Sequence, residues 1–459
     1  MRKFLKDHSF VGVVLVFSVL FLGILFRVLN LSGVSAWGDE VASLYYAQHL
    51  DRIFLHESHS PVYYFICSFW ISIFPKSILS LRYLSIFLSF LITALCTGLL
   101  WKRRGVGVAF MFLILWWLWP TDITYARQAR HYSLYAELTF LLLILWEQRS
   151  SFSRRVLLIF CSFFQLIHPF GLIPVWYLAF YDFFKKLSGR RQLFTFLGTS
   201  VPVGVYYAAR FFFYGREKVF SNISWISFDT FAFQRSFGLL FLGDSFPLTT
   251  VFPLPLFWSY FMLFLVAFIF MFRRGFISFL KQNESLLKFF QLTLLSIIFL
   301  ELFSFFYSNI RITRYFIYLV PFLLFSLLDW VQKTDIPGNL RRGVLLAGIL
   351  VPYNMFVFQP WRTYAWDDQN VANLKSYLQL LPPRVLVVCA NAFQQEYYFG
   401  RPYQNCSDEA LKLYLNKKNF YLFDLTGNDK LLTLFLLNSG HIDRYQKFNQ
   451  ALFLSVTYP

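Results

Sequence analysis

Two pairs of arginines share a three-residue spacing that is suited to binding an anion. Arg127 and Arg130 precede an apolar stretch, with His131 beside the second of them, and Arg311 and Arg314 repeat the spacing before another such stretch. On a helix this spacing places both guanidinium groups on one face, and the N–H groups at a helix amino terminus also favour anions. The pattern predicts phosphate binding. Arginines at a membrane boundary also extend toward lipid headgroups without a specific ligand, and this alternative stays open.

Two carboxylates follow the first apolar run of the chain. Asp39 and Glu40 come directly after Trp37 and Gly38, and the stretch from Val41 onward has the pattern of an amphipathic helix beside the membrane. Carboxylates placed near several cations are candidates for chemistry. They are equally suited to an acidic helix start, because the helix dipole favours negative charge there.

A further set of ionisable and aromatic residues is predicted on the same side of the membrane. The candidates for contacting a substrate are His59, His131, Tyr132, His168, Glu137 and Glu301. The two glutamates are alternatively buried partners of the arginines, and His168 is alternatively a polar helix end. We assign no metal site, because no third ligand accompanies His56 and His59. Use of a divalent cation, and of any other cofactor, stays open.

The composition shows which elements must position these residues. Of 459 residues, 57% are hydrophobic, 22% aromatic and only 14% charged, and the mean hydropathy is +0.52. An ordinary soluble domain carries about 25% charged residues, so that class is excluded. The net charge of +18 does not indicate nucleic acid binding, because Lys and Arg cluster between apolar runs, where they orient membrane helices.

Long apolar runs predict a polytopic α-helical membrane protein with about eleven spans, since lipid leaves each spanning backbone to satisfy its own hydrogen bonds. The first run is too long for the core of a signal peptide and is expected to be an uncleaved anchor. Residues 61–74 are apolar but too short to cross, and we expect an interfacial or re-entrant helix there. The runs lie at 10–29, 82–101, 106–120, 133–146, 156–172, 173–184, 192–213, 255–272, 286–306, 315–331 and 343–358.

The basic clusters fix the expected orientation. With a cytoplasmic amino terminus, the dense clusters near 102–104, 149–155, 185–191, 273–281 and 333–342 all fall on the inside. The candidate site residues then share the outer face of a cytoplasmic (inner) membrane. A pore or carrier would place such groups along its axis as well, so this one-sided pattern favours an outward-facing reaction site.

The composition changes near residue 361. We therefore predict a transmembrane domain over 1–360 and a small extracytoplasmic α/β domain over 361–459, with strands at 384–390, 419–425 and 451–458 and helices near 370–381 and 429–438. Cys389 and Cys406 both lie in this region, and whether they form a disulfide stays open.

Several motifs, taken in order, resemble those of a known class of enzymes. They are WGDE at 37–40, HSPVYY at 59–64, LRYLSIFLSFLI at 81–92, KRRG at 102–105, YARQARHYSLY at 125–135 and RYFIYLVP at 314–321. Over about residues 1–360 the chain is similar to the bacterial GT-C integral-membrane glycosyltransferases of family 39, which are related to protein O-mannosyltransferases and aminoarabinose transferase. One departure is His59-Ser60-Pro61, where the family usually has His-Pro-Pro.

The resemblance implies a glycosyltransferase whose donor is a sugar on a polyprenyl phosphate. The family's catalytic acid maps onto Asp39, with Glu40 beside it, and the four arginines named above would bind the donor phosphate. One base suffices, because a phosphate leaves without being protonated, and inversion at the sugar is expected. The acceptor is a glycan, lipid or protein.

Two other functions stay open. A transporter or flippase of a lipid-linked glycan would distribute polar groups through its spans and would not need Asp39 as a base. A non-catalytic membrane scaffold would depend on residues 361–459 to recruit a partner. The sequence does not identify the sugar, the acceptor, the prenyl chain length, metal dependence or the oligomeric state.

Overall fold

The computed structural model describes residues 10–29, 31–32, 38–56, 61–149, 153–220, 283–306, 317–333, 385–389, 413, 415–416, 418–424, 442–448 and 451–456. The first helices are α2 (Phe10–Val28), α3 (Gly38–Gln48), α4 (Leu50–His56), α5 (Val62–Ile73), α6 (Ile78–Arg104), α7 (Val106–Phe112), the π-helix η1 (Leu113–Trp117) and α8 (Pro120–Ala126). They are followed by α9 (Tyr132–Glu147), α10 (Arg154–Ile167), the 3-10 turn η2 (Pro169–Gly171), α11 (Leu172–Phe184), α12 (Arg190–Gly198), α13 (Val201–Phe220), α17 (Glu284–Phe306) and α18 (Leu319–Lys333).

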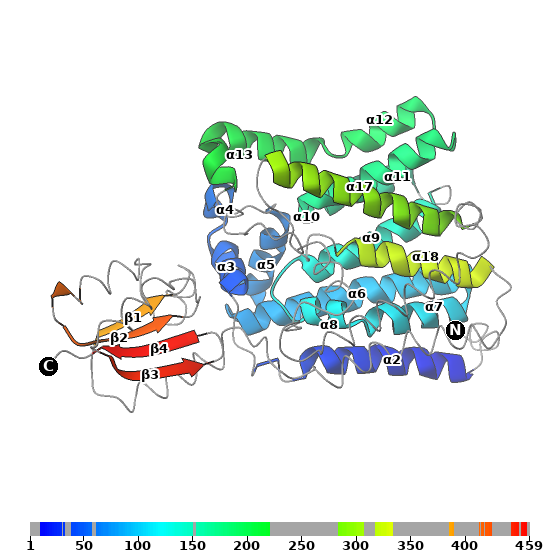
Figure 1. Ribbon diagram of the computed structural model, residues 1–459. Helices are drawn as coiled ribbons and strands as arrows, with labels where there is room; N and C mark the ends of the chain where they lie inside the picture. The colour runs from blue at the N-terminus through cyan, green and yellow to red at the C-terminus, as the bar shows by residue number, and fades with distance from the viewer. Residues whose placement is uncertain are drawn as a thin grey trace, which may run out of the picture.

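Most of these helices form one bundle with α9 at its centre. Helices α6, α10 and α18 all pack against α9, and Figure 1 shows α6, α9 and α18 running side by side. Nearly every side chain of α9 is buried, from Tyr132 to Trp146. A helix that is apolar around its whole circumference is suited to this central position. The polar candidates next to α9 are therefore held by the best-packed part of the bundle.

Helix α6 is the clearest membrane-spanning element. Within the described residues it is the one helix that is both long and apolar enough to cross a bilayer, while α5 and parts of α2, α7–η1 and α18 are apolar but shorter. Ser77 caps α6, accepting a hydrogen bond from the N–H of Ser80 at 3.2 Å. Gly105 ends it with φ of 87°, a conformation that favours glycine. Basic residues fill the last turn, where they complement the helix dipole.

Two of the predicted spans are interrupted in the structure. The run at 192–213 is divided into α12 and α13 at Thr199 and Ser200, so the expectation of one continuous helix was wrong. Side chains of α10 occupy the break: Gln165 Nε2 donates to Thr199 Oγ1 at 2.8 Å, and Ser162 Oγ donates to the Thr199 carbonyl at 3.0 Å. These contacts satisfy polar groups that a continuous helix would satisfy itself. The run at 106–120 likewise becomes α7 followed by η1.

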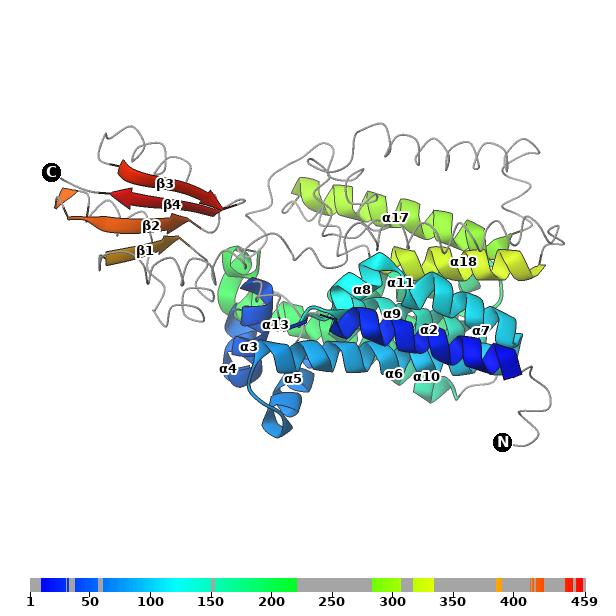
Figure 2. The same cartoon turned by 90° about the horizontal axis from the view of Figure 1, so that it is seen from below.

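The short helices α3, α4 and α5 lie together at one end of the bundle. Figures 1 and 2 show them at the end opposite the beginning of α2, with the far end of α13 beside α4. Helix α5 has 12 residues, too few for a full crossing, as expected from the length of the apolar segment 61–74; its interfacial or re-entrant position stays a prediction. This end of the bundle carries Asp39.

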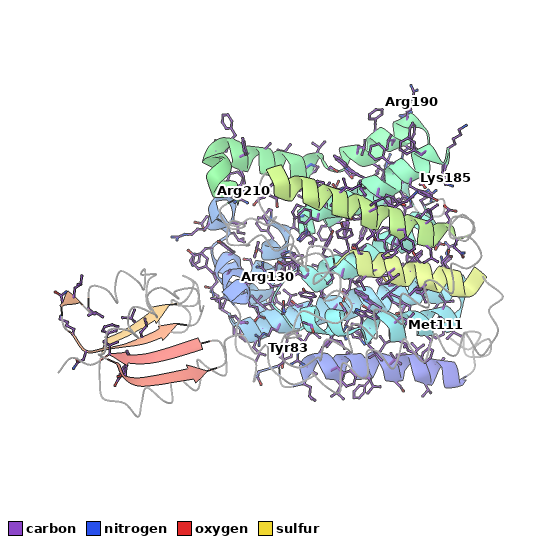
Figure 3. All side chains as sticks on the ribbon, in the orientation of Figure 1. Tyr83, Met111, Arg130, Lys185, Arg190 and Arg210 are labelled. Carbon is purple, nitrogen blue, oxygen red and sulfur yellow. The ribbon has the colours of Figure 1, made fainter. Side chains whose placement is uncertain are left out.

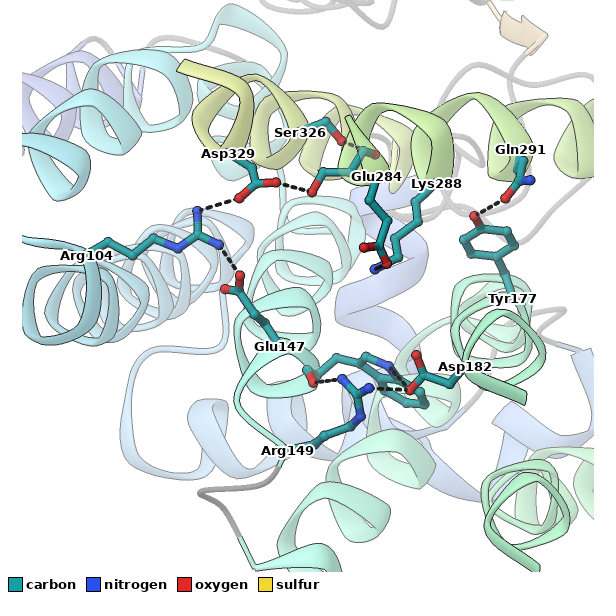
Figure 4. A network of polar contacts seen from close by, with 12 residues as sticks. Arg104, Glu147, Arg149, Tyr177, Asp182, Glu284, Lys288, Gln291, Ser326 and Asp329 are labelled. Atoms are coloured by element: carbon teal, nitrogen blue, oxygen red, sulfur yellow. Dashed lines mark hydrogen bonds and ion pairs between the residues drawn. The ribbon is translucent and has the colours of Figure 1, made fainter. Parts of the chain in front are cut away.

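The opposite end is held by a network of ion pairs (Figure 4). Arg104 at the end of α6 pairs with Glu147 of α9 and lies 3.5 Å from Asp329 of α18. Arg149 Nη2 lies 3.0 Å from Asp182 Oδ2 of α11, which also accepts from Trp146 Nε1 at 3.0 Å. Charges that the sequence assigned to inner loops thus join the ends of four helices.

A four-stranded sheet lies beyond the helical region in sequence. Its order is β1 (Val385–Cys389), β2 (Phe420–Asp424), β4 (Ala451–Val456) and β3 (Ile442–Phe448), with β1 and β2 parallel and the other neighbours antiparallel. Strands β1, β2 and β4 fall within the predicted ranges. Strand β3, IDRYQKF, was not predicted, because its charged residues mask the apolar alternation, as is common at a sheet edge. The two predicted helices of this region lie outside the described residues.

Candidate functional site

Asp39 and Arg130 face each other at the end of the bundle where the short helices gather. Asp39 Oδ2 lies 3.6 Å from Arg130 Nη2, and Arg130 Nη1 also donates to the Asp39 carbonyl at 3.2 Å. The side chain of Asp39 is 33% exposed, whereas that of Arg130 is 4% exposed. The carboxylate is therefore accessible, and the cation beside it is held in a largely water-excluded place, where its charge is poorly screened.

Arg130 is positioned by several other groups. Its Nη1 lies 3.3 Å from Ser43 Oγ and 3.4 Å from Tyr64 OH, and its Cζ lies 5.6 Å from the centre of the Tyr132 ring. These partners come from α3, α5 and α9. The guanidinium is therefore fixed by three helices that the sequence separates by up to about ninety residues.

Glu40 occupies a different environment from its neighbour Asp39. Its side chain is buried and accepts two hydrogen bonds from Arg82 of α6, from Nε at 2.8 Å and from Nη2 at 2.6 Å. Glu40 Oε1 also accepts from the backbone N–H of Ala129 at 2.8 Å. Successive helical residues point about 100° apart, so one carboxylate of the pair turns toward solvent while the other turns into the bundle. Glu40 fixes the loop that carries Arg130.

The arginine pair 127 and 130 does not share a helix face, so that expectation was wrong. Helix α8 ends at Ala126 and α9 begins at Tyr132, which leaves both arginines in the connecting loop. Arg127 Nη1 donates to the carbonyl of Phe26 at 2.8 Å, while Arg130 turns toward Asp39. The loop shape follows from the bond between Glu40 and Ala129, which a local helix prediction does not consider.

The predicted residues of α9 and its surroundings form a buried aromatic cluster. His131 and His168 have ring centres 5.1 Å apart, and His131 lies 4.4 Å from Tyr132. His168 stacks on Tyr135 at 4.6 Å, and its Nδ1 accepts from the N–H of Phe170 at 3.2 Å. The two histidines therefore lie close together, with His131 directly following Arg130 in the chain. His168 also caps the 3-10 turn η2 that follows His168.

Glu137 belongs to a separate buried cluster. Ser89 of α6 donates to Glu137, and Arg27 of α2 pairs with Asp122 of α8 while also donating to the Trp117 carbonyl at 2.9 Å. Burial raises the pKa of Asp122 to about 6, although the positive charge of Arg27 opposes this shift. These buried polar contacts involve side chains from four helices, α2, α6, α8 and α9.

Sequence reasoning did not select Arg27, Arg82 or Asp122. Each was a lone charged residue at or beside an apolar run, and such residues are costly in a membrane protein unless they are paired. The energetic cost of an unpaired charge beside an apolar run was the sequence signal that could have drawn attention to these residues. It could have identified them as paired residues, although it could not have identified their partners.

Some predicted site residues cannot be compared with the structure. His59, Arg311 and Arg314 lie outside the described residues, as do the side chain of Glu301 and the Cys389–Cys406 pair. Within the parts of the chain that are described, no group of three or more His, Cys, Asp or Glu side chains is arranged to hold a metal ion.

The comparisons with known proteins give matches among solved structures. No protein-family model matches the chain, and no curated protein matches it. The crystal structure of ArnT from Cupriavidus metallidurans in the apo state matches with a TM-score of 0.55 and 13% identity, covering 98% of both chains. The crystal structure of the same protein bound to undecaprenyl phosphate matches with a TM-score of 0.53 and 12% identity, also covering 98% of both chains. The chain has the GT-C fold of ArnT. At this level of identity the likeness concerns the fold, and it agrees with the fold that the sequence motifs implied.

Proposed function

We propose that this protein is a multi-pass membrane glycosyltransferase that moves a sugar from a polyprenyl phosphate to an acceptor at the extracytoplasmic face. The observation that carries the proposal is the partly exposed Asp39 carboxylate beside the buried Arg130 guanidinium. The shared fold supports it, and the matching ArnT structure that contains undecaprenyl phosphate supports a polyprenyl phosphate as the lipid.

Asp39 acts as the general base in this proposal. Its carboxylate takes the proton from an acceptor hydroxyl or amine as that group attacks the anomeric carbon. The bond between the sugar and the phosphate oxygen breaks, and its electron pair stays with the phosphate. Attack from the side opposite the phosphate inverts the configuration at the sugar. No second carboxylate is needed, since the leaving phosphate is stable as an anion.

Arg130 stabilises the charge that grows on the leaving phosphate. A guanidinium suits this role because it keeps its charge and donates two parallel hydrogen bonds to oxygens. Its partners Ser43 and Tyr64 hold it in place before the reaction, so little reorganisation is required. Arg127, Arg311 and Arg314 remain proposed phosphate contacts. Glu40 is proposed as a positioning residue, because its oxygens already bind Arg82 and Ala129.

The test is the variant Asp39→Asn in cells that lack the native protein. General-base assistance is worth about 10² to 10⁴ in rate, so we expect transfer to fall by that factor. Mass spectrometry of outer-surface glycans, lipids and proteins would show which sugar is lost, which would also identify the acceptor. Equal amounts of folded, membrane-inserted protein must be present in each strain.

The matched control is Asp51→Asn, the same chemical change at an exposed carboxylate in the first turn of α4. We expect this variant to retain full transfer. Full transfer by Asp39→Asn would refute the assignment of the base, and loss of transfer in both variants would show that the effect is not specific to Asp39.

A further inference from the structure

A further buried guanidinium, that of Arg210 in α13, lies apart from the groups described above. Arg210 is 1% exposed, and its Nε and Nη1 have no hydrogen-bond partner among the residues that the structure describes. A charged group held away from water in this way is unfavourable unless an opposite charge accompanies it. The ring of Tyr206 lies 6.0 Å from Arg210 Cζ, at the outer limit of a cation–π contact, so it does not replace a counter-ion.

Arg210 lies on the face of α13 that packs against α4. Tyr206, Arg210 and Phe213 are spaced four and three residues apart and so share one helix face. The ring of Phe54 in α4 contacts both aromatic members of this set, at 5.7 Å from Tyr206 and 6.4 Å from Phe213. Helix α4 directly follows α3, which carries Asp39. Figure 3 shows Arg210 and Arg130 at the same end of the bundle.

Apolar side chains of α13 are exposed on its other side and also at Phe213, which is 67% exposed although its ring contacts Phe54. Val205, Phe211 and Phe212 are all strongly exposed, and the most exposed is Phe212 at 83%. Such a surface suits the acyl chains of a lipid. Helix α13 therefore combines a lipid-compatible face with a buried cation at the level of the candidate site.

We propose that Arg210 binds the phosphate of a second lipid, separate from the phosphate at Arg130. A guanidinium donates charge-assisted hydrogen bonds to phosphate oxygens, and Nε and Nη1 are the donors of Arg210 that have no partner among the described residues. The bound phosphate would supply an opposite charge, which none of the described residues supplies to Arg210. This inference rests on the membrane location in the proposed function, but it does not require sugar transfer.

The test uses the full-length protein, purified in a neutral detergent. Its thermal unfolding midpoint is measured during titration with dioctanoyl phosphatidylglycerol, with dioctanoylglycerol, which lacks the phosphate, and with inorganic phosphate. We expect phosphatidylglycerol to raise the midpoint and dioctanoylglycerol to have no effect. In Arg210→Gln the apparent affinity for phosphatidylglycerol should fall about tenfold or more, because a charge-assisted hydrogen bond is lost.

Three variants make this result specific. Arg190→Gln, a matched change at an exposed arginine of α12, should respond as the native protein does. Arg130→Gln and Asp39→Asn should also keep the response to phosphatidylglycerol, so a failure of the proposed reaction would not affect this test. A matching effect of inorganic phosphate, also lost in Arg210→Gln, would support the anion site and identify free phosphate as the ligand.

The proposal is overturned by any of four results. The first is that the native protein responds to neither phosphate compound, and the second is that dioctanoylglycerol acts as strongly as phosphatidylglycerol. The third is that Arg210→Gln keeps the full response, and the fourth is that Arg190→Gln loses the response as Arg210→Gln does.

Discussion

The Glu40→Gln variant should unfold more readily than the native protein, because the substitution removes the negative charge that pairs with the buried Arg82. Glu40 is 2% exposed and binds Arg82 through two hydrogen bonds of 2.8 and 2.6 Å. Removing one partner of a buried ion pair costs about 3–5 kcal/mol. A glutamine oxygen can still accept from the N–H of Ala129, so we expect a loss near the lower end, about 3 kcal/mol.

The assay is unfolding of the purified protein in mixed micelles by increasing mole fractions of dodecyl sulfate, followed by tryptophan fluorescence and circular dichroism. Asp39→Asn is the matched control, since the neighbouring carboxylate is one-third exposed and its ion pair is longer, at 3.6 Å. Arg130 is buried but keeps its hydrogen bonds to the Asp39 carbonyl, Ser43 and Tyr64, and the lost carboxylate is partly solvated, so this control should lose only about 1 kcal/mol.

The two variants should therefore differ in how strongly they affect stability and sugar transfer. Glu40→Gln should lower both stability and transfer, because Glu40 fixes the loop that carries Arg130. Asp39→Asn should lower transfer with a much smaller effect on stability. If Glu40→Gln unfolded within about 0.5 kcal/mol of the native protein, the argument from burial and ion pairing would be refuted.

Two further predictions concern packing and pH. Gly23→Ala should destabilise the bundle by about 1–3 kcal/mol, because the added Cβ would lie 1.8 Å from Trp117 Nε1. Gly98→Ala meets open space and should be neutral or slightly stabilising in the same titration, and equal effects would contradict the packing argument. The raised pKa of Asp122, about 6, means that the folded state favours its protonated form. Its stabilising contribution should therefore be complete below about pH 4 and be lost as the pH rises through 6. Asp122→Asn should flatten the pH dependence of unfolding in this window, and an unchanged slope would show that another group titrates.

The sequence by itself determined the features that depend on local composition. The apolar run at 10–29 contains α2, and the run at 82–101 lies inside α6, because a helix in lipid must satisfy its own backbone and so needs a continuous apolar stretch. The short segment at 61–74 was also recognisable from its length. The ordered motifs from 37 to 321 implied the GT-C fold that the structural matches show.

Tertiary structure decided the roles of residues that look alike in sequence. Asp39 and Glu40 are adjacent carboxylates, yet only the packing of α3 against α6 places one near solvent and the other on Arg82. Arg127 and Arg130 diverge because Glu40, about ninety residues earlier, holds the N–H of Ala129.

The burial of Arg210 likewise depends on where α13 lies against α4. Charge pairing and burial are set by contacts between distant segments. A local pattern specifies which residues carry charge, whereas only the folded chain specifies which charges meet and which are withdrawn from water.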